Sequence, residues 1–142
     1  MKLIKEILEG KGSQVWSVAP DATVLDALKL MAEKELGALL VMADGKLVGI
    51  ISERDYARKV ILKGRSSTET LVKQIMAKRV IYTQLDQTVD ECMAIMTDKH
   101  VRHLPVMSEG QVVGIVSVGD LVKSIIAHQQ FVIEQLERFI SG

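Results

Sequence analysis

The chain has 142 residues, of which 48% are hydrophobic and 4% are aromatic. This length allows one compact domain or two small lobes around a shared core, and the composition predicts an aliphatic core rich in methionine. The 18 basic residues balance 18 acidic ones, so the chain has no excess of positive charge for binding a phosphate backbone. Nucleic acid is therefore not expected as its main partner.

Cys92 is the only cysteine in the sequence, which excludes an internal disulfide and agrees with the reducing cytoplasm. The first residues mix charged and apolar side chains and do not resemble a signal peptide. No apolar run approaches the roughly 20 residues that a membrane-spanning helix needs. We therefore expect a soluble, cytoplasmic protein with no membrane partner.

The first predicted elements are a short amphipathic helix in residues 1–14 and an extended segment over residues 15–18. After the Pro20 turn, Thr23 begins a helix in which Asp26, three residues later, completes a capping-box pattern. Apolar side chains recur on one face of this helix, which we therefore expect to pack on the core.

A β-hairpin follows, because two apolar runs, 38–42 and 46–51, flank a turn that contains Asp44-Gly45. Ser52 then begins a further helix. The predicted order of elements is strand, helix, strand, strand, helix.

The same order occurs twice, because the segment from about residue 20 to residue 61 recurs without a gap 65 positions later. Two copies are too few for a solenoid, so a closed pair with a pseudo-twofold axis is expected. The positions that carry the same residue type in both copies include Asp21, Thr23, Val24, Met31, Lys34, Leu39, Val41, Met42, Gly45, Val48, Gly49, Ile50, Ser52 and Asp55.

A polar stretch and a short helix join the two copies, and a last amphipathic helix is predicted after the second. The predicted segments are an N-terminal helix (1–14), repeat 1 (15–66), a linker helix (67–79), repeat 2 (80–127) and a C-terminal helix (128–142).

Each repeat places the motif Gly-apolar-apolar-Ser-x-x-Asp at its last strand-to-helix junction, as Gly49–Asp55 and Gly114–Asp120. With the Leu104-Pro105-Val106 strand, this tandem resembles the cystathionine-β-synthase (CBS) domain pair, or Bateman module, over roughly residues 15–126. The resemblance implies a mixed α/β (α+β) fold in which two β-α-β-β-α repeats pack about a pseudo-twofold axis and form two ligand clefts.

The chemistry of the motif agrees with a nucleotide ligand. Ser52 and Ser117 stand at helix N-termini, where free N–H groups and positive partial charge favour phosphate. Asp55 and Asp120 offer carboxylates that can accept two hydrogen bonds from a ribose diol, and Arg54 adds a guanidinium. Ser-x-x-Asp also resembles a capping box with Asp in place of Glu, so capping is the alternative for these residues.

The resemblance implies further contacts. It places Val18, Tyr82 and Thr83 near the adenine base, with strand packing as the alternative, and it implies that Arg102 and His103 reach phosphates. A surface salt bridge is the alternative for Arg102.

The two clefts are not expected to be chemically equal. The first copy has Gly37-Ala38 where the second has Arg102-His103, and Gly119 stands in the position of Arg54. One cleft is therefore expected to prefer a charged nucleotide, and the other a nucleoside, a different nucleotide or no ligand.

Neither a metal site nor an active site is expected. The three-residue spacing of His100 and His103 crosses a helix end, with no acidic or thiolate residue nearby in sequence. No nucleophile elbow, P-loop or dinucleotide-binding glycine motif is present, and Cys92 falls on a core face.

We therefore predict a non-catalytic, regulatory CBS-domain pair that binds an adenine nucleotide. AMP or ATP is the first expectation, and NAD or S-adenosylmethionine share the adenosine group. A homodimer is expected, together with a regulated protein that the sequence does not identify. The alternative is a dimeric adaptor whose clefts are vestigial and whose terminal helices hold partner proteins.

Overall fold

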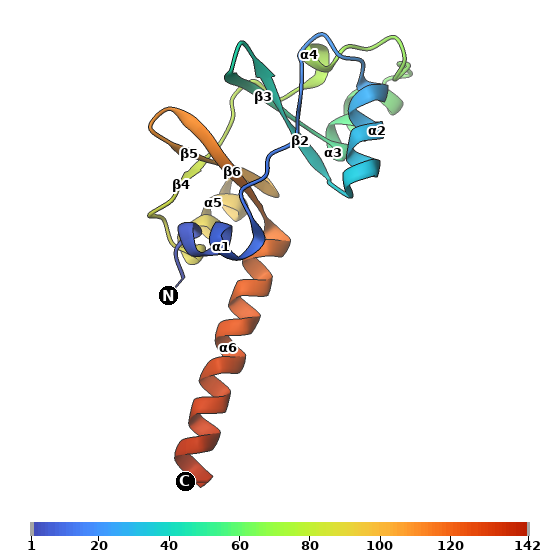
Figure 1. Cartoon of the computed structure of the whole chain (residues 1–142). Helices are drawn as coiled ribbons and strands as arrows, with labels where there is room; N and C mark the ends of the chain where they lie inside the picture. Colours follow the sequence, from blue (N-terminus) through green and yellow to red (C-terminus); the bar gives the residue numbers. More distant parts are fainter. Residues whose placement is uncertain (1, 142) are drawn as a thin grey trace. The chain divides into compact units, whose positions relative to one another are not determined.

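The computed structural model describes residues 2–141, which form two compact units. The central unit comprises residues 15–81, and the terminal unit combines residues 2–14 with residues 82–141. Each unit contains one three-stranded sheet with helices, as Figure 1 shows. This arrangement confirms the mixed α/β fold predicted from the repeats.

In the central unit the strands lie in the order β1-β2-β3, with β1 parallel to β2 and β2 antiparallel to β3. The predicted hairpin turn is present, and both of its central residues, Asp44 and Gly45, have positive φ, which suits the twist of the two strands. The elements are β1 (Ser17–Val18), α2 (Val24–Lys34), β2 (Ala38–Ala43), β3 (Lys46–Ser52), α3 (Glu53–Tyr56), the π-helix η1 (Ala57–Ile61) and α4 (Val72–Ile75).

The core of the central unit forms where the predicted face of α2 meets the sheet. The Thr23 hydroxyl accepts a hydrogen bond from the Asp26 N–H at 3.1 Å, which confirms Thr23 as the N-cap of α2. The buried side chains that pack together here are Val24, Ala27, Met31, Leu39, Val41, Ile51, Val60, Val72 and Ile75.

The terminal unit repeats this topology, with strands in the order β4-β5-β6 and the same parallel and antiparallel pairings. Its hairpin turn at Glu109 and Gly110 again has positive φ at both residues. The elements are α1 (Ile4–Lys11), β4 (Thr83–Gln84), α5 (Val89–Lys99), β5 (His103–Ser108), β6 (Gln111–Ser117) and α6 (Val118–Ser141).

The repeat extends further than expected, to the two short helices that precede each copy. Residues 3–8 read Leu-Ile-Lys-Glu-Ile-Leu, and residues 71–76 read Leu-Val-Lys-Gln-Ile-Met. Leu3 bridges to Thr88 as Leu71 bridges to Thr23. Each helix therefore leads into one repeat but packs in the unit that holds the other repeat.

These short helices explain the glycine that begins each motif. A Cβ atom added at Gly49 would lie 2.6 Å from Met76 Sδ, and one added at Gly114 would lie 2.8 Å from Leu8 Cδ1. Both distances are shorter than a normal van der Waals contact, so each glycine permits the close approach of its helix.

The predicted break between the last helix of repeat 2 and a separate C-terminal helix is wrong. One helix, α6, runs through all 24 residues from Val118 to Ser141. Only Gly119, in its first turn, is a helix-weakening residue, so nothing interrupts the backbone hydrogen bonds near residue 128. Within residues 2–141, no helix is both long and apolar enough to cross a membrane.

Candidate functional site

The Ser-x-x-Asp junction of the central unit forms a complete capping box. The Ser52 N–H donates to Asp55 Oδ2 at 2.9 Å, and the Asp55 N–H donates to Ser52 Oγ at 3.2 Å. Lys59, one turn later, lies 3.1 Å from Asp55 Oδ1 and donates to the Ile75 carbonyl at 2.9 Å. The Asp55 carboxylate therefore caps the helix with one oxygen and pairs with a lysine through the other.

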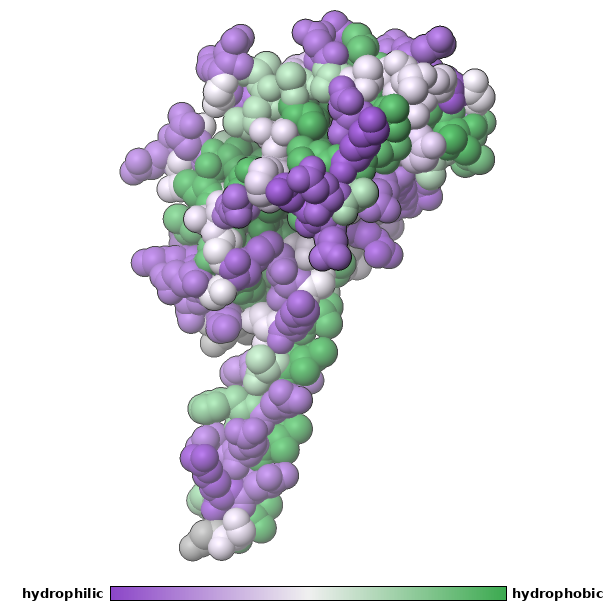
Figure 2. All heavy atoms as spheres, turned by 45° about the vertical axis from the view of Figure 1, so that its right-hand side comes forward, coloured by the Kyte–Doolittle hydropathy of each residue, from purple (hydrophilic) through white to green (hydrophobic). Residues whose placement is uncertain are grey.

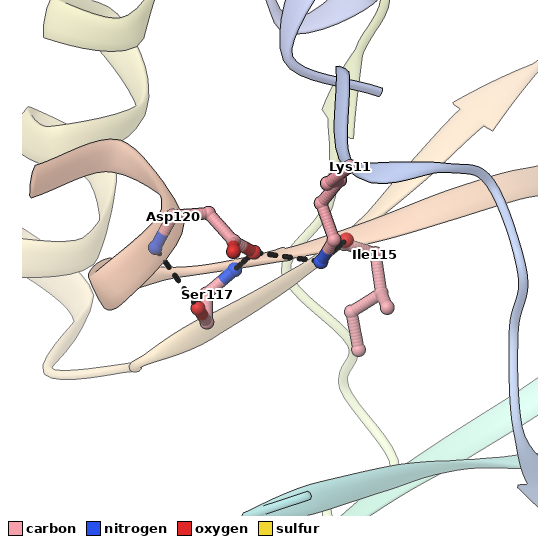
Figure 3. Close-up of polar contacts among 4 residues, drawn as sticks. All are labelled: Lys11, Ile115, Ser117 and Asp120. Carbon is pink, nitrogen blue, oxygen red and sulfur yellow. Dashed lines mark hydrogen bonds and ion pairs between the residues drawn. The ribbon is translucent and has the colours of Figure 1, made fainter. Parts of the chain in front are cut away.

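The terminal unit forms the same box but obtains its lysine from elsewhere (Figure 3). Asp120 Oδ2 accepts from the Ser117 N–H at 2.8 Å, and the Asp120 N–H donates to Ser117 Oγ at 3.1 Å. Lys11, at the end of α1 and 109 residues away in sequence, lies 2.7 Å from the same Oδ2 atom. Its Nζ also donates to the Ile115 carbonyl at 2.9 Å.

These contacts determine the protonation of Asp120. Burial of the Asp120 carboxyl acts to raise its pKa, but the hydrogen bond and charge of Lys11 and the hydrogen bonds from Ser117 outweigh burial, so the pKa lies below its ordinary value. Asp120 is therefore an anion at neutral pH, and its two oxygens act only as hydrogen-bond acceptors.

The terminal junction also lies beside the basic pair predicted to contact phosphate. The Val118 N–H, at the start of α6, donates to the Arg102 carbonyl at 2.9 Å, and His103 pairs with Ser117 across β5 and β6. The structure thus brings Arg102 and His103 to the junction that holds Lys11 and Asp120. In the central unit Gly37 stands at the position of Arg102, and its carbonyl accepts a hydrogen bond from the Glu53 N–H at 3.0 Å.

Arg54 is exposed in the first turn of α3, next to Asp55. The two junctions therefore differ in their basic side chains. The central one has Arg54 and Lys59, and the terminal one has Lys11, Arg102 and His103.

The three residues predicted near the base lie in or beside the first strands of the two sheets. Val18 of β1 pairs with Val41 of β2, and Val41 in turn pairs with Gly49 of β3. Val18 is therefore level with a residue that precedes Ser52 by three positions on β3. Tyr82 has 51% of its surface exposed and lines an open depression of ≈ 500 Å³ that includes neither Ser117 nor Asp120.

Thr83 is fully buried, and its side chain is already occupied. Its hydroxyl donates to Gln87 Oε1 at 2.7 Å and lies 3.0 Å from Cys92 Sγ. The position of Cys92 on the core face is confirmed, and burial raises the pKa of its thiol. Strand packing accounts for the Thr83 side chain, so only its backbone is available for a base.

The sequence analysis missed two residues of these junctions, Lys11 and Lys59. Lys59 follows Asp55 by four residues, and this helical spacing is a signal that was present in the sequence. Lys11 has no such local signal, because only the packing of α1 in the terminal unit brings it to Asp120.

Comparisons with known proteins agree with the presence of two repeats. The family model of the CBS domain matches twice, over residues 4–62 and 72–127. A CBS-domain protein from Burkholderia ambifaria is 49% identical, with a TM-score of 0.88 over 90% of this chain and 96% of that chain.

A mitochondrial CBS-domain protein of Arabidopsis thaliana, CBSX3, is 37% identical over 98% of this chain and 72% of its own length. The CBS-domain pair of protein MJ0100, solved with 5-methylthioadenosine and S-adenosyl-L-methionine, is 25% identical, with a TM-score of 0.80 over 90% of this chain and 98% of that chain. The two matches of one family model and the agreement of the folds lead to one conclusion: this chain belongs to the CBS-domain family and carries two CBS domains in tandem.

Proposed function

We propose that this protein is a non-catalytic regulatory module that binds a small molecule with an adenosine group at its Ser-x-x-Asp junctions. The observation that carries this proposal is the pair of matching junctions, each with an acidic side chain held at a helix N-terminus. The adenosine ligands of the related MJ0100 pair support the choice of ligand class. Among such ligands, AMP and ATP are the first candidates, and NAD and S-adenosylmethionine follow.

Capping and ligand binding are compatible uses of the same aspartate. A carboxylate has about four acceptor sites on its two oxygens, and the Ser117 N–H and Lys11 take two of those on Asp120. The remaining acceptor sites suit the two hydroxyl groups of a ribose. The cap holds the carboxylate in place, so the side chain loses little further conformational freedom when it binds.

A phosphate on the ligand would find three basic side chains at the terminal junction and two, Arg54 and Lys59, at the central one. Lys11, Arg102 and His103 belong to the terminal junction, and Arg102 can bind two phosphate oxygens at once. We therefore propose the terminal junction for a phosphorylated ligand, and the central junction, with Arg54, for the second site.

Regulation would follow if the ligand binds one arrangement of the protein more tightly than another. The ligand can shift the balance between the two arrangements only by the difference between its two binding free energies. Catalysis is not part of the proposal, because the two aspartates belong to separate units and each is engaged as a cap. The cytoplasmic location stays a prediction, and one relative is mitochondrial.

The test is isothermal titration of AMP, ATP, NAD and S-adenosylmethionine into the wild-type protein and into Asp55→Ala and Asp120→Ala. Each substitution is expected to weaken binding at one site at least tenfold. Glu91→Ala is the matched control, because Glu91 completes the capping box of α5 but belongs to neither junction. It should cost similar stability, about 1 kcal/mol, and leave ligand affinity unchanged.

Two results would contradict the proposal. The first is the absence of binding by any of the four ligands to protein that has been freed of bound nucleotide by unfolding and refolding. The second is unchanged affinity in both aspartate variants despite a loss of stability, which would assign these residues to capping alone and favour the dimeric adaptor.

A further inference from the structure

A depression of ≈ 430 Å³ opens on the surface of the central unit beside η1, and most of its lining is basic. None of the lining side chains is acidic. η1 is the only π-helical segment within residues 2–141, and such segments frequently occur at functional sites. The Ser-x-x-Asp motif does not account for this group of residues. The residues that line the depression are Lys59 in η1, Lys63 and Arg65 after it, and Gln74 in α4.

A tight turn after η1 brings Arg65 back to the depression that Lys59 lines. Gly64 makes this turn with a φ of 68°, in the left-handed region. The Arg65 N–H donates to the Val60 carbonyl at 2.9 Å. The Gly64 N–H donates to the Ile61 carbonyl at 3.1 Å, which completes the hydrogen-bond pattern of a Schellman C-cap. Carbonyl groups at this helix end, which would otherwise repel an anion, are therefore already engaged by N–H groups.

Two of the lining side chains are held in place by contacts that leave donors free. Lys59 Nζ contacts the Asp55 carboxylate and donates to the Ile75 carbonyl, which engages two of its three N–H groups. Gln74 Oε1 accepts from the Leu71 N–H at 2.7 Å, so the acceptor of this amide is engaged and its NH₂ group remains. Both residues therefore offer hydrogen-bond donors to the depression.

The other two lining side chains add positive charge. Lys63 and Arg65 are exposed, and none of the ion pairs within residues 2–141 involves either side chain. The Asp55 carboxylate offsets the charge of Lys59 alone. The charges of Lys63 and Arg65 are therefore in excess here, and they repel each other until an anion lies between them.

We propose that this depression binds phosphate, either as the free ion or as the phosphate group of a small molecule, separately from the two Ser-x-x-Asp junctions. The oxygens of phosphate are acceptors that match the donors of the lining. The planar guanidinium of Arg65 can hold two phosphate oxygens at once, and the ammonium groups of Lys59 and Lys63 supply positive charge. The proposal does not depend on nucleotide binding at either junction.

The equivalent surface of the terminal unit lacks this basic character. There α6 continues without a turn, and Figure 2 shows hydrophobic side chains along it. In α1, the counterpart of α4, Glu6 stands in the position of Gln74 and would repel an anion. The site is therefore expected in the central unit only. The residues 65 positions after Lys59, Lys63 and Arg65 are Ser124, His128 and Gln130.

Titration of the isotope-labelled full chain with inorganic phosphate, at constant ionic strength, tests the site by NMR. The amide signals of residues 58–66 and 72–75 should move as phosphate is added. Arg65→Gln is expected to weaken binding about tenfold, and Lys63→Gln about fivefold. The absence of phosphate-dependent shifts in these residues would overturn the proposal.

Arg58→Gln is the matched control for Arg65→Gln. Arg58 carries the same charge and is exposed on η1, but it does not line the depression. Its removal should change the phosphate dissociation constant less than about twofold. Equal losses in the two variants would show a general effect of net charge and contradict a site at the depression.

Asp55→Ala distinguishes this site from the neighbouring junction. The substitution removes the carboxylate that competes for Lys59, so phosphate should bind as tightly as to the wild type or more tightly. AMP binding at the central junction should fall in the same variant, and Arg65→Gln should leave it unchanged. If Arg65→Gln weakens AMP but not inorganic phosphate, the depression belongs to the nucleotide site and the proposal is wrong.

Glycerol phosphate separates the two sources of the phosphate group. Tighter binding of glycerol phosphate than of inorganic phosphate would support a site for a phosphorylated small molecule. Equal or weaker binding would support a site for the free ion. In both cases Arg65→Gln should weaken the tighter ligand about tenfold, and a tighter ligand that is insensitive to this substitution would overturn the proposal.

Discussion

The two Ser-x-x-Asp junctions share a sequence motif and a capping geometry but obtain their counter-charge in different ways. Asp55 pairs with Lys59 of the next turn, which any helix starting at Ser52 would supply. Asp120 pairs with Lys11 from α1, because its own helix has Ser124 at the position equivalent to Lys59. The same motif thus obtains its lysine counter-ion from the next helical turn in the central unit and from a distant helix in the terminal unit.

The largest difference in stability between matching variants of the two junctions is expected when their glycines are replaced. A Cβ at Gly49 would lie 3.0 Å from the Ala77 backbone carbonyl as well as near Met76, whereas a Cβ at Gly114 would meet only the end of the Leu8 side chain among its three nearest atoms. Gly49→Ala should therefore cost about 1–3 kcal/mol of unfolding free energy, and Gly114→Ala less. Chemical denaturation measures both.

Gly10→Ala is the control for these two variants, because Gly10 lies in α1 with nothing near its missing Cβ. It should increase stability by up to about 1 kcal/mol. If Gly114→Ala costs as much as Gly49→Ala, the distinction between a fixed carbonyl and a movable side chain is wrong.

The next effect concerns phosphate recognition. Arg102→Gln is expected to weaken a phosphorylated ligand about tenfold at the terminal junction, roughly 1.4 kcal/mol, without changing the affinity for adenosine. Titration with AMP and adenosine compares the two. Arg138→Gln, on the exposed part of α6, is the charge-matched control, and an equal loss in that variant would point to a general effect of net charge.

Removal of the lysines should destabilise the two junctions to different extents. The two aspartates are similarly buried, with side chains 20% (Asp120) and 18% (Asp55) exposed, but the Lys11 side chain is 35% exposed and the Lys59 side chain 46%. Lys11→Met should therefore destabilise the protein by about 1 kcal/mol and Lys59→Met by less. A double-mutant cycle with Asp120→Asn measures the coupling directly, and additive effects would exclude it.

The smallest effect is the pH dependence of this ion pair. Because the pKa of Asp120 is lowered in the folded state, its contribution to stability is complete above the unfolded pKa of about 4 and is lost as pH falls through the folded value. The stability advantage of the wild type over Lys11→Met should therefore be constant near neutral pH and shrink below about pH 4. An advantage that persists at pH 2 would assign it to packing of the Lys11 side chain.

Most of the fold followed from local patterns in the sequence. The Thr23 cap, the Asp44-Gly45 turn and the recurrence of these features 65 residues later predicted the helices and hairpins that the structure contains. The predicted boundary at residue 128 is wrong, because the change from apolar to polar residues near His128 does not interrupt α6. Such a change alters what covers a helix but does not break its backbone hydrogen bonds.

By itself, the sequence determined most of the strands, helices, turns and caps, because those interactions act over a few positions. It also determined the family, through two copies of one motif in register. Only the tertiary structure decided that α1 and α4 each pack in the unit of the other repeat, and that Lys11 neutralises Asp120. The contact between Lys11 and Asp120, 109 positions apart, depends on how α1 packs in the terminal unit, and no local sequence pattern predicts that packing.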